Sequence, residues 1–177
     1  IVRHLEDSGL YDNTVILFTA DHGDYGGQFR SFYKGNPYEG ATHVPFVVRD
    51  PRSPKRGHVE SAHASNMDLF ASCLAWAGAS QPAGSDSRDF TDLLHGNGSN
   101  WDNVAGWSTR NQAMLVRNGL KIMREARKDG AVCEAYDLQA DPLEACNIAD
   151  APAEADRVDA LRQELDAWCA RQKEEEA

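Results

Sequence analysis

Several features that would point to common functional classes are missing from this 177-residue sequence. It has no run of eighteen apolar residues, so we expect no membrane-spanning helix within the chain. Its four cysteines, Cys73, Cys133, Cys146 and Cys169, stand singly and form no Cys-x-x-Cys pair. That spacing excludes the usual zinc patterns, although an even number of cysteines permits disulfides. No internal repeat or long low-complexity tract is present.

Positive charge is also scarce, because 18 Lys and Arg residues face 28 Asp and Glu residues, for a net charge of −10. Nucleic-acid binding needs clustered basic residues, so we expect no nucleic-acid partner. The segment 30–56 is an exception, with six basic residues against Glu39 and Asp50. A locally basic region suits an anionic substrate. For residues 49–56 alone, a solvated loop is the better interpretation.

The length is enough for one domain with a sizeable core. The chain starts at Ile1, and Val2 and Leu5 before Gly9 look like the last turns of a helix. We therefore expect the chain to be cut from a larger protein. A secretion signal would lie upstream of Ile1, outside this sequence.

The most informative stretch is TVILFTADHGD, which begins at Thr14. Its apolar start, residues 14–20, predicts a fully buried strand of a parallel sheet, with Asp21 and His22 at its carboxyl end. Ligands bind at that edge in open α/β sheets, so the acid and the imidazole are candidate metal ligands. Gly23 permits a sharp turn or a close backbone approach.

Thirteen residues after Asp21, the loop YKGNPYEG carries Lys34, and a second apolar strand is expected over residues 44–48. An acid, an imidazole and an ammonium on one unit suggest an anion held beside a metal. A plainer interpretation also fits each residue by itself: Asp21 as a helix cap, His22 as a surface histidine and Lys34 as a solvated lysine.

Two stretches in the right order, TVILFTADHGD…YKGNPYEGATHVPFVV and YDLQADPLEACNIAD, resemble patterns of the type I sulfatases in the alkaline phosphatase superfamily. The resemblance implies that Asp21 and His22 bind a divalent cation, calcium first and manganese second. It also implies that Lys34 is a catalytic and substrate-binding residue that contacts the sulfate. One departure is that Gly27-Gln28-Phe29-Arg30 stands where many relatives have a Gly-(Asp/Glu)-His-Gly pattern.

The resemblance further implies an α/β fold: the C-terminal part of an alkaline-phosphatase-like α/β sandwich, followed by a small subdomain. We place residues 1–105 in the sulfatase α/β domain, with half of the metal site. Residues 106–177 form the small C-terminal α+β subdomain, which has a hairpin, a short strand and a long helix. The remaining N-terminal part of the parent domain is an expected partner.

The resemblance implies that the parent hydrolyses an organic sulfate ester, a small molecule or a carbohydrate. The family's nucleophile is a formylglycine made from the first residue of Cys/Ser-x-Pro-x-Arg, and none of the four cysteines begins that pattern. The chain alone is therefore expected to be inactive. Two alternatives stay open: a phosphodiester or phosphonate monoester hydrolase of the same superfamily, or a non-catalytic fragment. The identity of the ester and the oligomeric state are not read from the sequence.

Local patterns predict three further elements. Residues 66–78 form a helix that should pack on the sheet through an apolar face of Met67, Phe70, Cys73, Leu74 and Ala77. Asn118-Gly119 between two apolar runs predicts a hairpin. Residues 151–176 form a helix whose apolar stripe, which should pack on the small sheet, contains Val158, Leu161, Leu165 and Trp168.

Overall fold

A computed structural model of the protein describes residues 1–128 and 130–175. The chain divides into two compact units. Unit 1 contains residues 1–22, 44–61 and 66–102, and unit 2 contains residues 23–43, 62–65 and 103–177. The mixed α/β class predicted from the sequence is confirmed. The sequence-based division at residues 105 and 106 stays a prediction about the parent domain.

Unit 1 contains a two-stranded sheet of β1 (Ile16–Thr19) and β2 (Phe46–Arg49). The two strands are antiparallel, with Phe18 opposite Val47. The expected fully buried strand of a parallel sheet is therefore wrong for this pair, since Phe18 is 63% exposed and Val47 is 61% exposed. Neighbouring parallel strands need a crossover, usually a helix. The connection here holds only η2 (Gln28–Arg30) and the four-residue α2 (Glu39–Thr42).

Five helical elements complete unit 1: α1 (Val2–Asp7), η1 (Tyr11–Asn13), α3 (Asp68–Ala77), α4 (Thr91–His95) and η3 (Gly98–Asn100). Helix α3 forms where it was predicted, but the predicted apolar face is wrong. Met67, Phe70 and Cys73 are exposed, and Asp68 and Ser72 are buried instead. These polar side chains have partners, because Asp68 binds Arg88 and Ser72 Oγ accepts the backbone N–H of Phe90.

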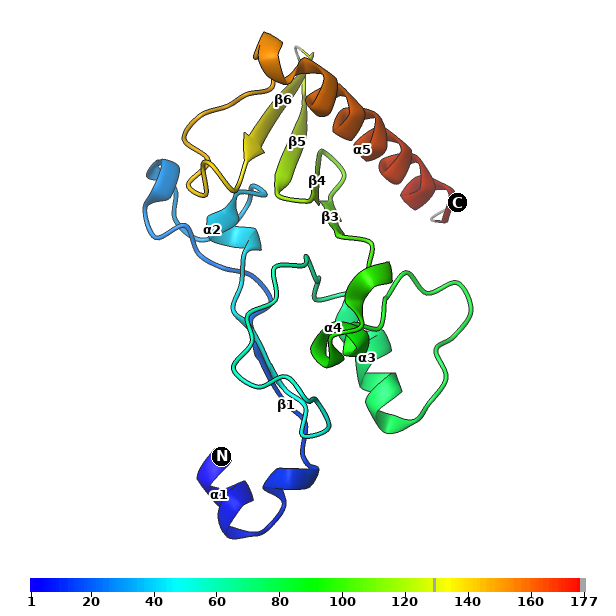
Figure 1. The fold of residues 1–177 in the computed structure, drawn as a ribbon. Coiled ribbons are helices and arrows are strands. Elements are labelled where there is room, and N and C mark those ends of the chain that lie inside the picture. The colour runs from blue at the N-terminus through cyan, green and yellow to red at the C-terminus, as the bar shows by residue number, and fades with distance from the viewer. Residues whose placement is uncertain (129, 176–177) are drawn as a thin grey trace. The chain divides into compact units, whose positions relative to one another are not determined.

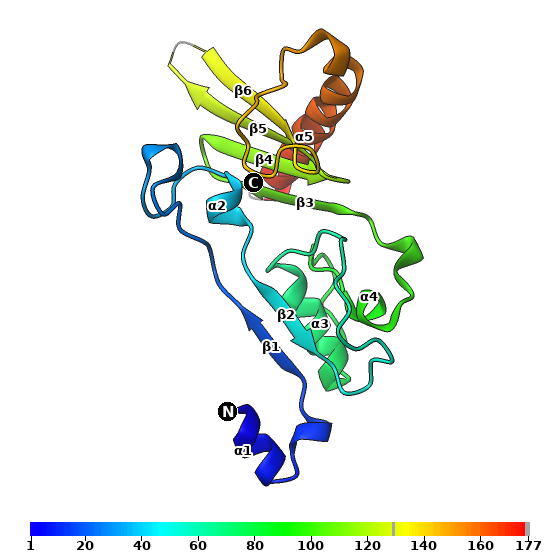
Figure 2. The ribbon, with the colours of Figure 1, turned by 60° about the vertical axis from the view of Figure 1, so that its left-hand side comes forward.

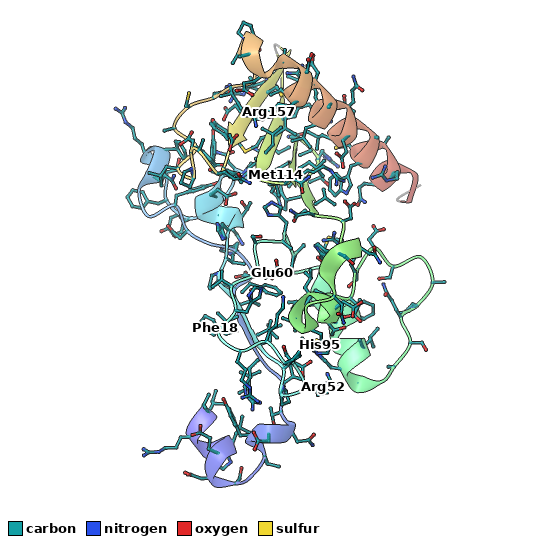
Figure 3. All side chains as sticks on the ribbon, in the orientation of Figure 1. Phe18, Arg52, Glu60, His95, Met114 and Arg157 are labelled. Carbon is teal, nitrogen blue, oxygen red and sulfur yellow. The ribbon has the colours of Figure 1, made fainter. Side chains whose placement is uncertain are left out.

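A buried carboxylate links the loop after β2 to α3 and α4. Asp50 accepts hydrogen bonds from Arg52 and from the indole N–H of Trp76, and its Oδ2 lies 3.3 Å from His95 Nε2. Figure 3 shows Arg52 and His95 side by side. Burial by itself would raise the pKa of Asp50, but Arg52 and Trp76 outweigh it and hold that pKa at about 2.

Unit 2 is built on a four-stranded antiparallel sheet in the order β3-β4-β5-β6 (Figure 2). The strands are β3 (Val104–Ser108), β4 (Gln112–Arg117), β5 (Leu120–Arg127) and β6 (Gly130–Asp137). The predicted hairpin between β4 and β5 is confirmed. Asn118 and Gly119 have φ values of 51° and 84°, the pair of positive angles that a tight hairpin turn of this kind requires.

One face of this sheet packs against α5 (Ala155–Glu175), which follows the short η4 (Pro152–Glu154) (Figure 1). The predicted apolar stripe is confirmed, because Val158, Leu161 and Leu165 are at most 4% exposed and lie in one cluster with Ile122. Trp168 packs against that cluster. Glu176, the last residue of the predicted helix, lies outside the described residues.

The other face of the same sheet carries a second cluster, with Met114, Val116, Met123 and Tyr136. Tyr38, which directly precedes α2, packs against it. The segment 23–43 thus belongs structurally to the C-terminal sheet, and the sheet is covered on both faces. No helix in the described part of the chain is long and apolar enough to span a bilayer.

Candidate metal and anion site

Asp21 and His22 follow β1 after one residue, Ala20, and their side chains point toward each other. Asp21 Oδ2 lies 3.3 Å from His22 Nε2, and the Asp21 side chain is 84% exposed. Asn66 fixes the backbone beneath them: its side-chain amide donates to the carbonyl oxygens of Ala20 and Asp21, at 2.9 and 3.4 Å. Thr19 Oγ1 in turn donates to Asn66 Oδ1. No sequence pattern singles out Asn66.

The geometry of this pair fits two ligands of one cation. Calcium–oxygen bonds are about 2.3–2.6 Å long, so two neighbouring ligand atoms are separated by about 3–3.5 Å. The observed 3.3 Å lies in that range. A carboxylate oxygen suits calcium, while an imidazole nitrogen also suits manganese and other transition metals. Within residues 1–128 and 130–175, however, no group of three or more His, Cys, Asp or Glu side chains could hold a metal ion. Asp21 and His22 would therefore supply only part of a coordination sphere.

Gly23, the next residue, approaches another stretch of backbone too closely for any side chain. A Cβ atom at this position would lie 2.1 Å from the carbonyl oxygen of Gly40. The N–H of Gly23 donates to the carbonyl oxygen of Ala41 at 2.8 Å. The close approach expected of Gly23 is therefore made to the chain itself, and it brings the two ends of the segment 23–43 together.

Lys34 lies in the middle of that segment, and its side chain is exposed. Its neighbours are constrained. Tyr33 and Gly35 have φ values of 66° and 152°. The backbone N–H of Tyr25 donates to the carbonyl oxygen of Tyr33, and the buried Tyr25 hydroxyl exchanges hydrogen bonds with the backbone of Asn36. The ammonium is thus free to meet an anion while the backbone on either side is fixed.

The stretch that replaces the usual Gly-(Asp/Glu)-His-Gly pattern makes structural contacts here. Gln28 Nε2 donates to the carbonyl oxygen of Leu143 at 3.2 Å. Phe29, in the left-handed region with φ 53°, stacks on Tyr38 with ring centroids 4.4 Å apart. Tyr38 in turn donates its hydroxyl proton to Glu134. This stretch and Tyr38 therefore help to hold the segment 23–43 on the sheet.

The basic segment also contains a partly buried carboxylate, Glu39, with a partner on each oxygen. Glu39 accepts a hydrogen bond from Lys121 Nζ at 2.8 Å, and its other oxygen lies 3.0 Å from His43 Nδ1. Burial would raise the pKa of Glu39, but His43 and Lys121 together lower it to about 2. The same hydrogen bond raises the pKa of His43. The His43 side chain is 77% exposed.

The structure brings Asp21 and His22 together in unit 1, and it places Lys34 in unit 2. Sequence reasoning missed two charged residues of unit 2, Lys121 and Glu144, which are 0% and 1% exposed. A signal for the first was present, because Lys121 stands inside the apolar run Leu120–Met123. A lysine enclosed by apolar residues in a strand indicates either an edge position or a buried ion pair.

Comparisons with known proteins agree with these motifs. Residues 1–79 match the sulfatase family model. The chain is 30% identical over 164 residues to an arylsulfatase K of Xenopus laevis, covering 84% of this chain and 30% of that protein. A solved structure in complex with its substrate D-glucosamine-2-N,6-O-disulfate superposes with a TM-score of 0.86 at 26% identity, covering 98% of this chain and 37% of that one.

A second solved structure widens the range of relatives. The phosphonate monoester hydrolase of Agrobacterium radiobacter superposes with a TM-score of 0.80 at 25% identity, over 96% of this chain and 37% of that one. The chain therefore spans about a third of the length of the proteins it matches. The family match, the arylsulfatase relatives and the shared fold agree. The chain belongs to the sulfatase family of the alkaline phosphatase superfamily.

Proposed function

We propose that the full-length protein is a metal-dependent sulfatase that hydrolyses an organic sulfate ester. The observation that carries the proposal is the convergence of Asp21 and His22 at the end of β1, with Lys34 thirteen residues beyond Asp21 on a constrained loop. The family match supports it, as do relatives that carry the name arylsulfatase. A carbohydrate sulfate is a suitable substrate class, because a solved relative holds a sulfated glucosamine.

In this proposal Asp21 and His22 hold one divalent cation, with calcium ranked before manganese. Bound there, the cation supplies the largest local positive charge for a sulfuryl group and its nucleophile. The contribution of the chain is the fixed geometry of the pair, because Asn66 holds the backbone carbonyl groups of Ala20 and Asp21. The described residues offer no third ligand of these types beside the pair. The resemblance to the sulfatases implies that the remaining ligands lie in the N-terminal part of the parent domain.

Lys34 acts in this proposal as a point charge on the sulfate. Negative charge moves toward the leaving oxygen as the ester bond breaks, and a positioned ammonium stabilises that charge. A compact ammonium on a flexible stem suits this role better than a planar guanidinium. Lys34 is exposed while its neighbours are held by Tyr25, so the ammonium can reach an anion without rearrangement of the loop.

A formylglycine nucleophile is the expected partner of these residues and belongs to the N-terminal remainder of the parent domain. Covalent catalysis has no first step without a nucleophile. The 177-residue chain alone is therefore expected not to turn over sulfate esters.

A second candidate function is the hydrolysis of a phosphonate monoester or a phosphodiester. It is favoured by the likeness to the phosphonate monoester hydrolase of Agrobacterium radiobacter. Phosphonate monoesters and sulfate esters are both tetrahedral anions, so a cation site and a lysine serve either. A non-catalytic role is the third candidate.

The experiment that separates the three candidates is a substrate comparison on the full-length protein loaded with calcium or manganese. An aryl sulfate, an aryl phosphonate monoester and an aryl phosphodiester are offered under identical conditions. We expect the highest kcat/KM for the sulfate. A higher value for the phosphonate or the diester establishes the second candidate, and no turnover of any ester by metal-loaded protein with intact formylglycine establishes the third.

A further inference from the structure

The most buried charged cluster of the described residues lies on the face of the C-terminal sheet that the segment 23–43 covers. Lys121 on β5 is 0% exposed, and in the sheet register it lies opposite Val116 of β4 and Tyr136 of β6. Its ammonium donates to Glu39 Oε1 at 2.8 Å and lies 2.8 Å from Glu144 Oε1. A buried lysine is stable only when its charge is paired, so this cluster is a specific interaction and not a solvated surface contact.

The cluster joins three segments that are far apart in the sequence. Lys121 comes from the sheet, Glu39 from the start of α2, and Glu144 from the turn after β6. Glu144 also binds the α2 end directly, because its Oε2 accepts the backbone N–H of Glu39 at 2.6 Å. Removing any one of the three charges would leave the others buried without full compensation.

The backbone of Glu144 has an unusual conformation, which directs its carboxylate toward Lys121. Its φ of 55° lies in the left-handed region, which a residue with a side chain adopts at some cost. The turn around it is held by Asp141, whose carbonyl oxygen accepts the N–H of Glu144 and whose carboxylate accepts the N–H of Cys146. The strained residue thus delivers a carboxylate, 1% exposed, to the ammonium of Lys121.

Each carboxylate of the cluster has a partner on a basic side chain. Two carboxylates, Glu39 and Glu144, face one ammonium, and His43 stands on the outer oxygen of Glu39 at 3.0 Å. The hydrogen bond to Glu39 raises the pKa of His43, which favours the protonated imidazole beside that carboxylate. The cluster therefore joins an ammonium from the sheet to a carboxylate and an imidazole from the segment itself.

The same segment carries Lys34, and it is held on the sheet at further points between Lys34 and Glu39. Asn36 accepts a hydrogen bond from Gln112 of β4 at 2.7 Å, and the Tyr38 hydroxyl donates to Glu134 of β6 at 2.8 Å. Pro37 between them is buried. The backbone position of Lys34 is thus set by the C-terminal sheet, and the Lys121 cluster is the charged part of that attachment.

From these contacts we infer that Lys121 is a positioning residue, which acts through Glu39 and Glu144 to hold the Lys34 ammonium where it meets the substrate anion. The inference rests on the proposed role of Lys34. In this inference the four-stranded sheet supports the reaction by fixing the position of Lys34. Lys121 itself is enclosed and does not reach a substrate.

A double-mutant cycle on the full-length protein tests the inference, with four forms: parent, Lys34→Ala, Lys121→Met and the double variant. Methionine keeps the length of the lysine stem and removes the charge. We expect Lys121→Met to lower kcat/KM for an aryl sulfate by about 10- to 100-fold with bound metal unchanged, because a misplacement of about 1 Å has that effect. In the Lys34→Ala background the same change should cost no more than about twofold, because the group being positioned is gone.

Lys128→Met is the matched control, since Lys128 is exposed just beyond β5, and it should leave the rate at the parent value. If Lys121→Met does not fold, Glu39→Gln enters the same cycle. This change leaves the backbone N–H of residue 39 in place to donate to Glu144, while the charge pair with Lys121 is lost. The same non-additive pattern is expected from it.

Three outcomes overturn the inference. Equal losses from Lys121→Met in both backgrounds would show a general structural defect that does not act through Lys34. A Lys121→Met protein, or a Glu39→Gln protein in its place, that turns over at the parent rate would show that the cluster positions nothing. A Lys34→Ala protein as fast as the parent would remove the proposed role of Lys34 and the inference with it, whereas the first two outcomes leave that role intact.

Discussion

The two sheets of this chain bury their apolar side chains to very different extents. In the four-stranded sheet, Leu115 and Ile122 are 1% and 0% exposed, and both faces are covered, one by α5 and the other by the segment 23–43. In the two-stranded sheet, Phe18 and Val47 are 63% and 61% exposed. The two parts of the proposed site therefore belong to regions whose side chains are packed to different degrees. Lys34 sits on a segment fixed by a packed sheet, whereas Asp21 and His22 follow a strand that is only partly covered.

The largest expected effect of a single substitution on stability lies in the core between α5 and the four-stranded sheet. Leu165→Ala should lower the free energy of unfolding of the full-length protein by about 2–5 kcal/mol, because Leu165 is 1% exposed within the cluster beneath α5. Chemical denaturation of parent and variant measures the change. An unaltered midpoint would contradict the burial of the α5 stripe.

Phe18→Ala is the matched control from the other sheet. It removes a larger side chain, but one that is 63% exposed in this chain. If Phe18 has the same surroundings in the full-length protein, the change should stay within about 0.5 kcal/mol. A loss as large as that of Leu165→Ala would show that the face of β1 is covered there, and the comparison between the two sheets would then hold only within this chain.

A smaller effect is expected on acidification, and it differs between the units. Glu39 in unit 2 and Asp50 in unit 1 both have their pKa lowered to about 2, from ordinary values of 4.5 and 3.8. A carboxylate with a depressed pKa stabilises the fold above its unfolded pKa, and this contribution is lost as pH falls through the folded pKa. Stability should therefore decline between about pH 4.5 and 2, by about 1–3 kcal/mol for each such group.

Neutral variants assign the two contributions. Glu39→Gln should flatten the decline from about pH 4.5 downward, while Asp50→Asn should flatten it only below about pH 3.8. Unfolding curves taken at half-unit steps of pH measure both. A decline that is unchanged in the Glu39→Gln protein would show that the Lys121 cluster does not depend on that charge.

Some elements followed from the sequence because their signals are local. Asn118-Gly119 supplies two positive φ angles in succession, and that alone specifies the hairpin between β4 and β5. The stripe of α5 repeats over several turns, so its buried face was read from periodicity. Asp21 and His22 are adjacent in the sequence, and their closeness needed no knowledge of the fold.

Other features depend on partners that are distant in the sequence. The inward face of α3 contains Asp68 and Ser72 because Arg88 and the N–H of Phe90 satisfy them, and no periodicity in residues 66–78 reports those partners. Whether β2 runs parallel or antiparallel to β1 depends on the path of the chain between the two strands, which the local pattern of neither strand reports. The burial of the Lys121 charge depends on Glu39 and Glu144, which are both distant from it in the sequence.

The most direct test of the central claim is aryl sulfate turnover with bound metal quantified in each form of the protein. The forms are the full-length parent, Lys34→Ala, Lys34→Arg, Asp21→Ala and the 177-residue chain alone. Lys34→Ala should lower kcat/KM by about 100- to 1,000-fold with metal content unchanged, and Lys34→Arg should recover little of it. Asp21→Ala should lose metal and activity together, and the short chain should be inactive. A Lys34→Ala protein as fast as the parent, an Asp21→Ala protein with full metal content, or appreciable turnover by the short chain would contradict the account.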